Sequence, residues 1–281
     1  MKKKTIYYWS PYLTEIATSK AVINSAHSLR KYFKNYETHI IDSVGEFRNK
    51  IDEINKKNVS IMRLNKLNLI PILPKHGKFN SRISFLIIFL INFFPLKNLL
   101  KKNKPDFLVI HLITSLPLIL FFLFNFETKC ILRISGFPML GPTRKLLWSI
   151  LLKKVHLVTC PTIKTLNYMK KLKIIDQNKL KLLYDPAISV REIAKRKNEK
   201  IQKFENELIA VGRLTKQKNF EFLIRNFKKI IEKNKNLKLS IFGDGEQKIF
   251  LENKVKELNL QTKVKLVSFK ENIFPYIKSS E

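Results

Sequence analysis

AVGRLTKQKNFEFLI, residues 210–224, decides the fold, because it passes from a buried strand through a glycine into a basic loop and then a helix. The strand ends at Gly212, where the lack of a Cβ permits a tight turn and the close approach of another group. Arg213 and Lys218 follow in the loop, and an amphipathic helix begins at Phe220. Two cations at a strand's carboxyl end, beside a helix amino terminus, form a receptor for a diphosphate. In a chain this rich in lysine, a solvated basic loop is the competing interpretation.

A second strand-to-helix turn follows in IFGDGEQKIFLENKV, residues 241–255. Gly243 and Gly245 bracket Asp244 just before the helix, so that backbone N–H groups have room to approach a phosphate or a base. Taken alone, this pattern also fits an ordinary glycine-rich turn. It does not stand alone, because the same order of strand, glycine and helix has just occurred at Gly212.

The whole chain alternates short apolar strands with helices. Strands that are apolar throughout are typical of a parallel sheet covered by helices on both faces. We therefore predict an α/β fold with two Rossmann-like doubly wound domains, residues 1–189 and 204–281, joined by a charged linker at 190–203, with the second domain incomplete. The expected strands are 4–9, 38–42, 59–64, 107–111, 129–134, 155–160, 208–211, 237–242 and 264–267. The expected helices are 15–32, 46–57, 82–100 (kinked or ended near Pro95), one from Ser115, 163–173, 220–233, 246–258 and 273–281.

Composition narrows the class of protein. Of 281 residues, 45% are hydrophobic, which suffices for sizeable cores and excludes a disordered or fibrous chain. The formal net charge of +32 has three competing interpretations. It attracts nucleic acid, it attracts an anionic membrane surface, or it reflects a general lysine bias of the sequence. The sequence has no zinc spacing, RNP-like strand or basic heptad region, so we expect no nucleic-acid partner. Cys130 and Cys160 lack metal-ligand spacing, which predicts no metal site and favours buried thiols in a reducing cytosol.

Two apolar segments raise the question of a membrane. Residues 107–126 carry no charge and are long enough to span a bilayer, but Pro105 and Asp106 before them and Thr114 and Ser115 within them favour a buried strand, a turn and a helix. Residues 85–96 are also apolar. We weigh peripheral attachment to an anionic membrane through this segment against a buried helix with a solvated basic rim. The basic neighbours are Arg82, Lys97, Lys101, Lys102 and the helix at 164–173.

Three segments together, GRLTKQKNF, LKLSIFGDGEQKIFLENKVKELNL and VKLVSFKENIFPYIKSSE, resemble the carboxyl-terminal half of the family 4 nucleotide-sugar glycosyltransferases of the GT-B fold. The resemblance is clearest over residues 208–281. It implies that Arg213 and Lys218 bind the donor diphosphate, and that Gly212 and the turn Gly243, Asp244 and Gly245 line the nucleotide pocket. It further implies a nucleotide sugar as donor substrate, no metal and no cofactor.

The amino-terminal half then corresponds to the acceptor domain. The turn SPYLTEIATSK lies where the family usually has a glycine-containing loop near the donor phosphates, but its glycines are missing, which leaves Thr14 and the backbone at Glu15 as candidates. The resemblance names no certain catalytic residue and places His111 near the cleft as a weak catalytic candidate, although a histidine in an apolar run is more often a core residue. Arg133 and Gly136 follow another strand, and Arg133 either holds an acceptor phosphate or pairs with a nearby acid.

The sequence departs from the pattern of this family at one point that bears on activity. In the family, two glutamates separated by seven residues follow the segment that here ends at Glu281, and we expect the chain without them to turn over donor poorly. The expected function is transfer of a sugar, with retention, to a lipid-linked or polysaccharide acceptor in cell-surface polysaccharide synthesis. The expected location is cytoplasmic, at the inner face of the plasma membrane. The alternative is a non-catalytic basic remnant or a membrane-surface binding protein.

Overall fold

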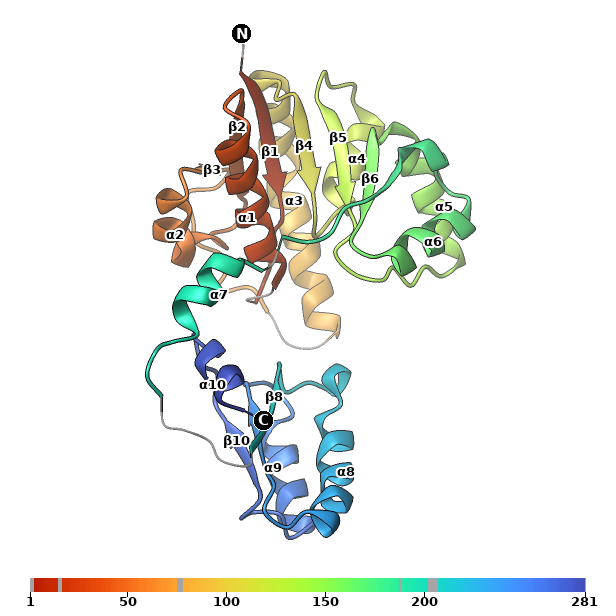
Figure 1. Ribbon diagram of the computed structural model, residues 1–281. Helices are drawn as coiled ribbons and strands as arrows, with labels where there is room; N and C mark the ends of the chain where they lie inside the picture. Colours follow the sequence, from red (N-terminus) through yellow and green to blue (C-terminus); the bar gives the residue numbers. More distant parts are fainter. Residues whose placement is uncertain (1–2, 15–16, 75–77, 187, 202–206, 281) are drawn as a thin grey trace. The chain divides into compact units, whose positions relative to one another are not determined.

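The computed structural model describes residues 3–14, 17–74, 78–186, 188–201 and 207–280. The chain divides into two compact units, Met1–Ala187 and Ile188–Glu281 (Figure 1). Each unit is built around its own parallel sheet, with helices in the connections between strands.

The first unit contains a seven-stranded sheet in the order β3-β2-β1-β4-β5-β6-β7, in which every neighbouring pair is parallel. The chain order reverses at β1, which pairs with β2 on one side and β4 on the other. The strands are β1 (Lys4–Trp9), β2 (Tyr36–Asp42), β3 (Ser60–Arg63), β4 (Phe107–Ile110), β5 (Lys129–Arg133), β6 (Leu157–Cys160) and β7 (Leu180–Leu182).

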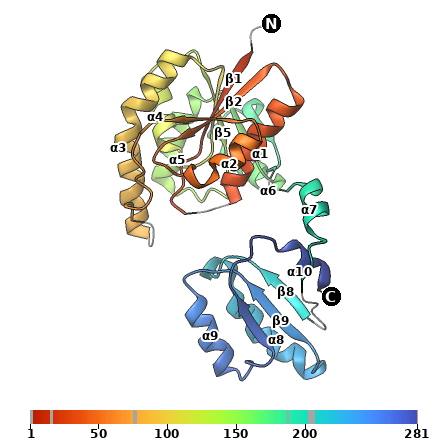
Figure 2. The same ribbon diagram turned by 90° about the vertical axis from the view of Figure 1, so that its left-hand side faces the viewer.

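Helices cover both faces of this sheet. Tyr7 and Trp9 contribute to a core shared with α3, α4 and α5, whereas Ile6 and Tyr8 contribute to a core shared with α1 and α2. The alternation follows from the two-residue period of a strand. Figure 2 shows α1 and α3 on opposite sides of the sheet. The helices are α1 (Ala17–Tyr32), α2 (Ile51–Lys56), α3 (Lys78–Asn103), α4 (Ser115–Leu123), α5 (Pro142–Leu151) and α6 (Ile163–Leu172), with short 3₁₀ turns at Arg48–Lys50, Leu152–Lys154 and Gln177–Lys179.

Helix α3 is longer than the sequence indicated, and it does not end at Pro95. Its buried side chains recur every four residues, so that one face packs on the sheet and holds the helix together past the proline. The segment Phe79–Asn103 is the only helix in the described part of the chain with the length and hydropathy of a membrane span; an 18-residue window within it has a mean hydropathy of 1.9, and 28% of that window is buried. The buried residues are Ser84, Ile88, Asn92, Leu96 and Leu100.

The apolar run 107–126 is divided as the sequence predicted, into β4, a turn and α4. Two elements of the first unit were not expected from the sequence, namely α5 and β7. The thiols of Cys130 and Cys160 are buried, and burial raises the pKa of both.

The second unit has a three-stranded parallel sheet in the order β10-β9-β8. Phe220, Ile224 and Phe227 of α8 pack with Leu251 and Val255 of α9 in its core. The elements are α7 (Val190–Arg196), β8 (Glu207–Val211), a 3₁₀ turn at Lys216–Lys218, α8 (Phe220–Lys233), β9 (Lys238–Phe242), α9 (Lys248–Glu257), β10 (Val264–Val267) and α10 (Phe274–Ser279).

Part of the segment expected to be a linker is helical. Helix α7 begins after Ser189, whose side chain accepts a hydrogen bond from the Glu192 N–H. Its last residue, Arg196, accepts a hydrogen bond at its carbonyl from the Asn272 side chain and lies 3.8 Å from the carboxylate of Glu271. The helix therefore belongs to the second unit, and the boundary falls at 187/188 rather than at 189. The overlooked signal was Ser189 three residues before Glu192, which is the spacing of a capping box.

A buried carboxyl pair follows β2. Glu46 is buried and accepts hydrogen bonds from the Ser43 and Val44 backbone N–H groups and from the Ser43 hydroxyl. Burial, together with a hydrogen bond to Asp42 and its charge, raises the pKa of Glu46 to about 8. Asp42 in turn accepts from the Gly45 N–H. The loop is held by a carboxyl group that is protonated at neutral pH.

We predict that Glu46→Gln removes part of the pH dependence of stability. Because the folded pKa is raised, the contribution of Glu46 is fully present below its unfolded pKa and is lost as pH rises through about 8. In urea denaturation at pH 5 and pH 9, the wild type should lose on the order of a few kcal/mol more than Glu46→Gln. The exposed control Asp52→Asn should follow the wild type. Equal pH slopes in wild type and Glu46→Gln would contradict the prediction.

Candidate functional site

The carboxyl ends of β1, β4 and β5 meet at one edge of the first sheet, where the loops that follow them line a cavity of about 850 Å³. The cavity lies at the reversal of strand order between β1 and β4, the usual position of ligand sites in doubly wound sheets. Thr14, His111, Arg133 and Gly136 all line it. The structure thus brings together four of the five residues expected on the acceptor side, and Glu15 lies outside the described residues.

His111 is the most unusual of these residues. Only 3% of it is exposed, and neither ring nitrogen has a hydrogen-bond partner among the described residues. Burial, helped by the nearby charge of Arg133, lowers the pKa of His111 to about 3. Its imidazole is therefore neutral at physiological pH, and both of its ring nitrogens are buried.

Arg133 pairs with an acid, which was one of its two sequence-based alternatives. Its guanidinium contacts one carboxylate oxygen of Asp185 at 2.6 and 2.9 Å, and donates to the carbonyls of Leu183 and Tyr184. These contacts hold residues 183–185 against the end of β5. The positive charge of Arg133 is therefore compensated within the first unit. Arg133 is not a free cation of the kind that an acceptor phosphate would need.

Helix α5 contributes a lining face that sequence reasoning missed. Arg144, Leu147, Trp148 and Leu151 all line the cavity, at the spacing of one helical face. The Arg144 side chain is exposed and has no partner among the residues that the structure describes. Pro142, in the first turn of α5 after Gly141, was the signal that would have located this helix.

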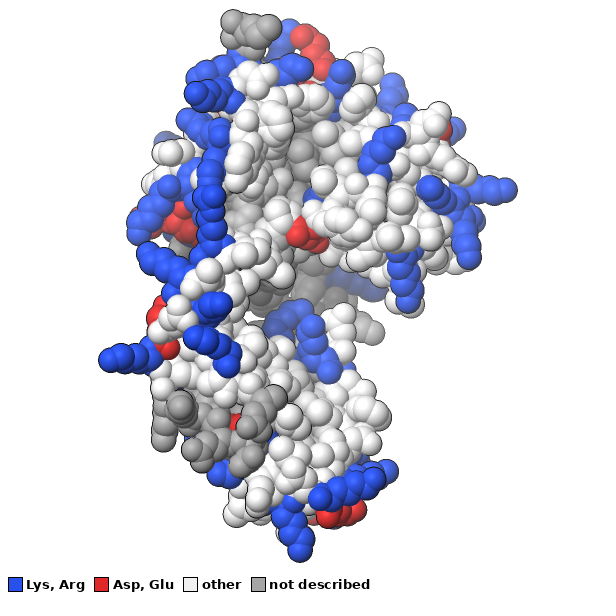
Figure 3. Space-filling model, in the orientation of Figure 1, with Lys and Arg blue, Asp and Glu red and all other residues white. Residues whose placement is uncertain are grey.

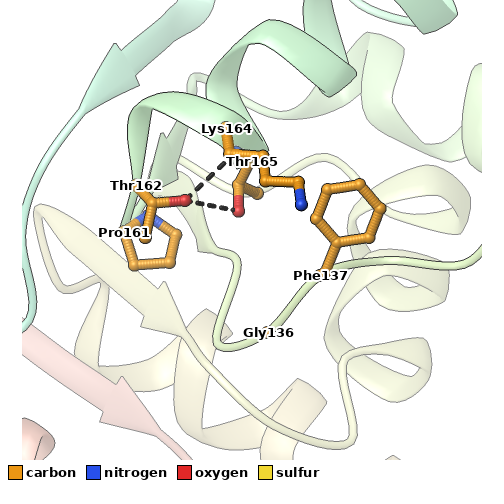
Figure 4. Close-up of a pocket in the computed structure, with 6 residues that line it drawn as sticks. All are labelled: Gly136, Phe137, Pro161, Thr162, Lys164 and Thr165. Atoms are coloured by element: carbon orange, nitrogen blue, oxygen red, sulfur yellow. Dashed lines mark hydrogen bonds between the residues drawn. The ribbon is translucent and has the colours of Figure 1, made fainter.

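A second hollow, shown in Figure 4, adjoins the first and shares Gly136 and Phe137 with it. Its other side is the start of α6, where the Thr162 hydroxyl accepts from the Thr165 N–H at 3.1 Å. The Lys164 ammonium lies 6.0 Å from the centre of the Phe137 ring. Because the helix is capped by its own threonine, we assign this hollow no ligand.

In the second unit, the loop after β8 presents the two cations expected from the sequence. Gly212 continues the strand pairing by donating to the Phe242 carbonyl, and the buried Leu214 anchors the loop in the core. Arg213 and Lys218 are exposed, and neither has a side-chain partner among the described residues. The Lys218 side chain lies near Gly212, with its Cδ 3.8 Å from the point that a Cβ of residue 212 would occupy. Both cations are available to an anion.

The turn after β9 packs directly on that loop. Gly243 has a φ of +149°, and a Cβ there would lie 1.9 Å from the Gly212 carbonyl oxygen. A Cβ at Gly245 would lie 2.4 Å from the Leu214 carbonyl oxygen. The Leu214 N–H donates to the Asp244 carbonyl at 3.0 Å. The two glycines are therefore explained by contact between the loops, before any ligand is considered.

Asp244 is engaged within the protein. Its carboxylate accepts from the Phe269 N–H at 2.8 Å and lies 3.5 Å from the Lys248 ammonium. The hydrogen bond from Phe269 is the main cause of the lowered pKa of Asp244, followed by contacts with Lys248. Asp244 therefore connects the loop after β10 to the glycine turn at 243–245. Its effect on the site is to hold these two loops together. Among the described residues, no group of three or more His, Cys, Asp or Glu side chains is placed to hold a metal.

Comparison with known proteins places residues 191–281 in the family described as glycosyl transferases group 1. An uncharacterized glycosyltransferase of Methanocaldococcus jannaschii is 30% identical over 209 residues, which are 66% of this chain and 51% of that protein. An N-acetylgalactosamine-N,N'-diacetylbacillosaminyl-diphospho-undecaprenol 4-alpha-N-acetylgalactosaminyltransferase of Campylobacter jejuni is 36% identical over 107 residues, 38% of this chain and 28% of that protein. The chain thus spans about half the length of the first relative and less of the second.

Solved structures share the fold. A glycosyltransferase from Rickettsia africae matches with a TM-score of 0.68 and 16% identity, covering 100% of this chain and 72% of that one. Anabaena HepE, in complex with UDP and glucose, matches with a TM-score of 0.63 and 11% identity, covering 99% of this chain and 72% of that one. At these identities the likeness concerns the fold alone, and that fold is GT-B.

We predict that Gly243→Ala destabilises the second unit, because the new Cβ meets the Gly212 carbonyl and the positive φ disfavours alanine. The expected loss is about 1–3 kcal/mol or more, measured by hydrogen exchange of the β9 amides. Gly136→Ala is the control, since its Cβ would meet nothing within 4 Å. Unchanged β9 protection in Gly243→Ala would contradict the loop contact.

Proposed function

We infer that this chain, which belongs to the group 1 glycosyltransferases through residues 191–281, transfers a sugar from a nucleotide-sugar donor to a lipid-linked or polysaccharide acceptor. In this reaction the bond from the anomeric carbon to the diphosphate breaks and the nucleoside diphosphate leaves. An acceptor hydroxyl oxygen forms the new glycosidic bond, and its proton passes to the leaving diphosphate, which has taken the electron pair of the broken bond. We propose retention at the anomeric centre, as in the family that the sequence resembles. The observation that carries the proposal is the pair of unpartnered cations beside Gly212 in the family-matched unit.

Arg213 and Lys218 are the proposed ligands of the donor diphosphate. The leaving diphosphate gains negative charge as the anomeric bond breaks, and cations already in place stabilise that charge without reorganising. The loop that carries them is fixed by Leu214 in the core and by the glycine turn at 243–245. The complex of HepE with UDP and glucose agrees with a nucleotide ligand on this fold.

The first unit is the proposed acceptor side. Its cavity offers a neutral, unpartnered His111 and an exposed Arg144 in a largely apolar lining. The neutral imidazole of His111 is not suited to binding a charged group. The Campylobacter relative is named for a diphospho-undecaprenol acceptor, which supports a lipid-linked acceptor in polysaccharide synthesis.

We also propose peripheral attachment to the anionic inner face of the plasma membrane through α3. On the helix face opposite its buried side chains, large apolar residues recur at helical spacing and are exposed. Basic side chains follow at the carboxyl end, where Lys97 lies 4.2 Å and Lys101 5.7 Å from the centre of the Phe124 ring. Figure 3 shows Lys and Arg in many places on the drawn face and few acidic side chains. The exposed apolar residues are Phe79, Ile83, Leu86, Leu90 and Phe94.

The donor assignment predicts that Arg213→Ala/Lys218→Ala weakens binding of UDP or GDP by about a hundredfold or more, since each charge-assisted hydrogen bond contributes roughly 1.5–3 kcal/mol. Isothermal titration calorimetry measures the affinities. The control Lys228→Ala/Lys229→Ala removes the same charge from the exposed side of α8 and should keep the wild-type affinity within about twofold. Equal affinity in wild type and in Arg213→Ala/Lys218→Ala would remove the assignment.

The membrane assignment predicts flotation with vesicles that contain phosphatidylglycerol, weaker in high salt because salt screens the attraction between lysines and lipid. Leu90→Asp/Phe94→Asp should reduce the floated fraction several-fold by placing charge in the apolar stripe. The control Phe222→Asp/Ile249→Asp changes comparably exposed residues of the second unit and should leave flotation unchanged. Binding that did not depend on lipid charge or on salt, or an equal loss of flotation in both double variants, would contradict the assignment.

A further inference from the structure

A hollow at the amino-terminal edge of the first sheet takes no part in the proposed function. It has a volume of about 390 Å³ and is lined by residues of α4 and of the segments around the starts of β5, β6 and β7. Because these strands are parallel, their amino ends meet at one edge, whereas the larger cavity lies at the other. The length of β5, Lys129–Arg133, separates the two edges by about 13 Å. This amino-edge hollow is therefore distinct from the proposed acceptor cavity.

Three lysines from three separate segments line the amino-edge hollow, and their charges are not neutralised by carboxylates. Lys129 begins β5, and its side chain has no partner in the part of the chain that the structure describes. The Lys154 ammonium lies 3.4 Å from the Asn125 side-chain oxygen, and the Lys179 ammonium lies 3.4 Å from the Lys153 carbonyl oxygen. Both acceptors are neutral. The three positive charges therefore remain available to an anion, which would also relieve their mutual repulsion.

A general lysine bias does not explain this gathering of charge. The acidic residue of the described lining, Glu127, already forms an ion pair with Lys104. The larger cavity has Arg144 as its unpaired cation among the described residues, and the hollow of Figure 4 has Lys164. With +32 on the whole chain, each hollow is expected to have some cation, but the amino-edge hollow has three.

The number of cations and the rest of the lining indicate the chemistry of the ligand. Three ammonium groups match a diphosphate or triphosphate, which carries several negative charges, better than the single charge of a phosphodiester. Phe124 and Phe126 add apolar surface, with ring centres 6.3 Å apart, and His156 lies in the same lining. A volume of about 390 Å³ is within the usual range for small-molecule sites. The hollow therefore fits a phosphate-rich metabolite that also has an apolar or aromatic part.

We propose that the amino-edge hollow binds the diphosphate or triphosphate group of a small soluble metabolite, as a site separate from those of the donor and the acceptor. Lys129, Lys154 and Lys179 bind the phosphate oxygens, and Phe126 contacts the attached group. No covalent bond is made or broken there. A ligand that binds only the folded protein stabilises it, so occupancy of this site stabilises the first unit at the edge opposite the larger cavity.

The test uses inorganic triphosphate and the full chain, at physiological salt without divalent cations. Because triphosphate would also bind the proposed donor cations, the titrations use the Arg213→Ala/Lys218→Ala background. Calorimetry should show saturable binding of one triphosphate per chain. The chain has five histidines, and His156 lines the hollow, so its imidazole NMR signal should shift with the same affinity. The spectrum of His156→Gln identifies that signal by its absence.

A matched pair of variants in the same background tests the location. Lys154→Gln/Lys179→Gln should weaken triphosphate binding about tenfold or more, because two charged donors to the phosphate oxygens are lost. Lys170→Gln/Lys171→Gln removes the same charge from exposed residues of α6 that do not line the hollow. This control should bind within about twofold of its parent, since salt screens charges outside the site. Circular dichroism checks that both variants are folded.

Four outcomes would overturn the proposal. No saturable binding would show that the lysines hold no anion, and a His156 signal that does not move would place the bound anion elsewhere. Equal weakening in both double variants would mean general attraction to a basic chain. Dihexanoyl-phosphatidylglycerol that binds as tightly as triphosphate, below its micelle-forming concentration, would make this a lipid-headgroup site. The donor cations are absent from the background, so failure here leaves the donor assignment standing, and failure of the donor assignment leaves this site.

Discussion

The parallel pairing of β1 with β4 is the constraint on which the first unit depends. Ile6 lies opposite Phe107, and the Thr5 N–H donates to the Asp106 carboxylate, although 101 residues separate the two. Parallel neighbours cannot be joined by a hairpin, so each connection must cross a face of the sheet. Because strand order reverses at β1, the loops after β1 and β4 leave in different directions. The cavity forms where they separate, and its position follows from the backbone rather than from any single side chain.

In the second unit the corresponding constraint is the approach of two loops. The carbonyls of Gly212 and Leu214 occupy the space that a Cβ would need at Gly243 and Gly245. This contact fixes the loop that carries Arg213 and Lys218, so that two flexible cations begin from a rigid backbone. Asp244 extends the arrangement to the loop after β10 through the Phe269 N–H. The glycine turn thus shapes the loop in which we propose that the donor diphosphate binds.

The distribution of apolar residues connects folding with the proposed function. Helix α3 buries one face and exposes another that is equally apolar, and α5 places Leu147 and Trp148 toward the cavity while Leu146 is exposed elsewhere. A soluble domain gains nothing from such exposure. The proposed attachment of α3 to a membrane would cover its exposed apolar stripe.

The sequence by itself determined the kinds of elements and the glycine-containing loops after β8 and β9, because periodicity and glycines act locally. The boundaries of β1, α8 and β10, the division of residues 107–126 and the loops at Gly212 and Gly243 could all be predicted in this way. Tertiary structure alone decided the pairing of Arg133 with Asp185, 52 residues away, the isolation of His111 and the face of α5 that lines the cavity. Local patterns report which side chains are apolar or charged, but a partner distant in the chain is selected only when the sheet brings its strand ends together.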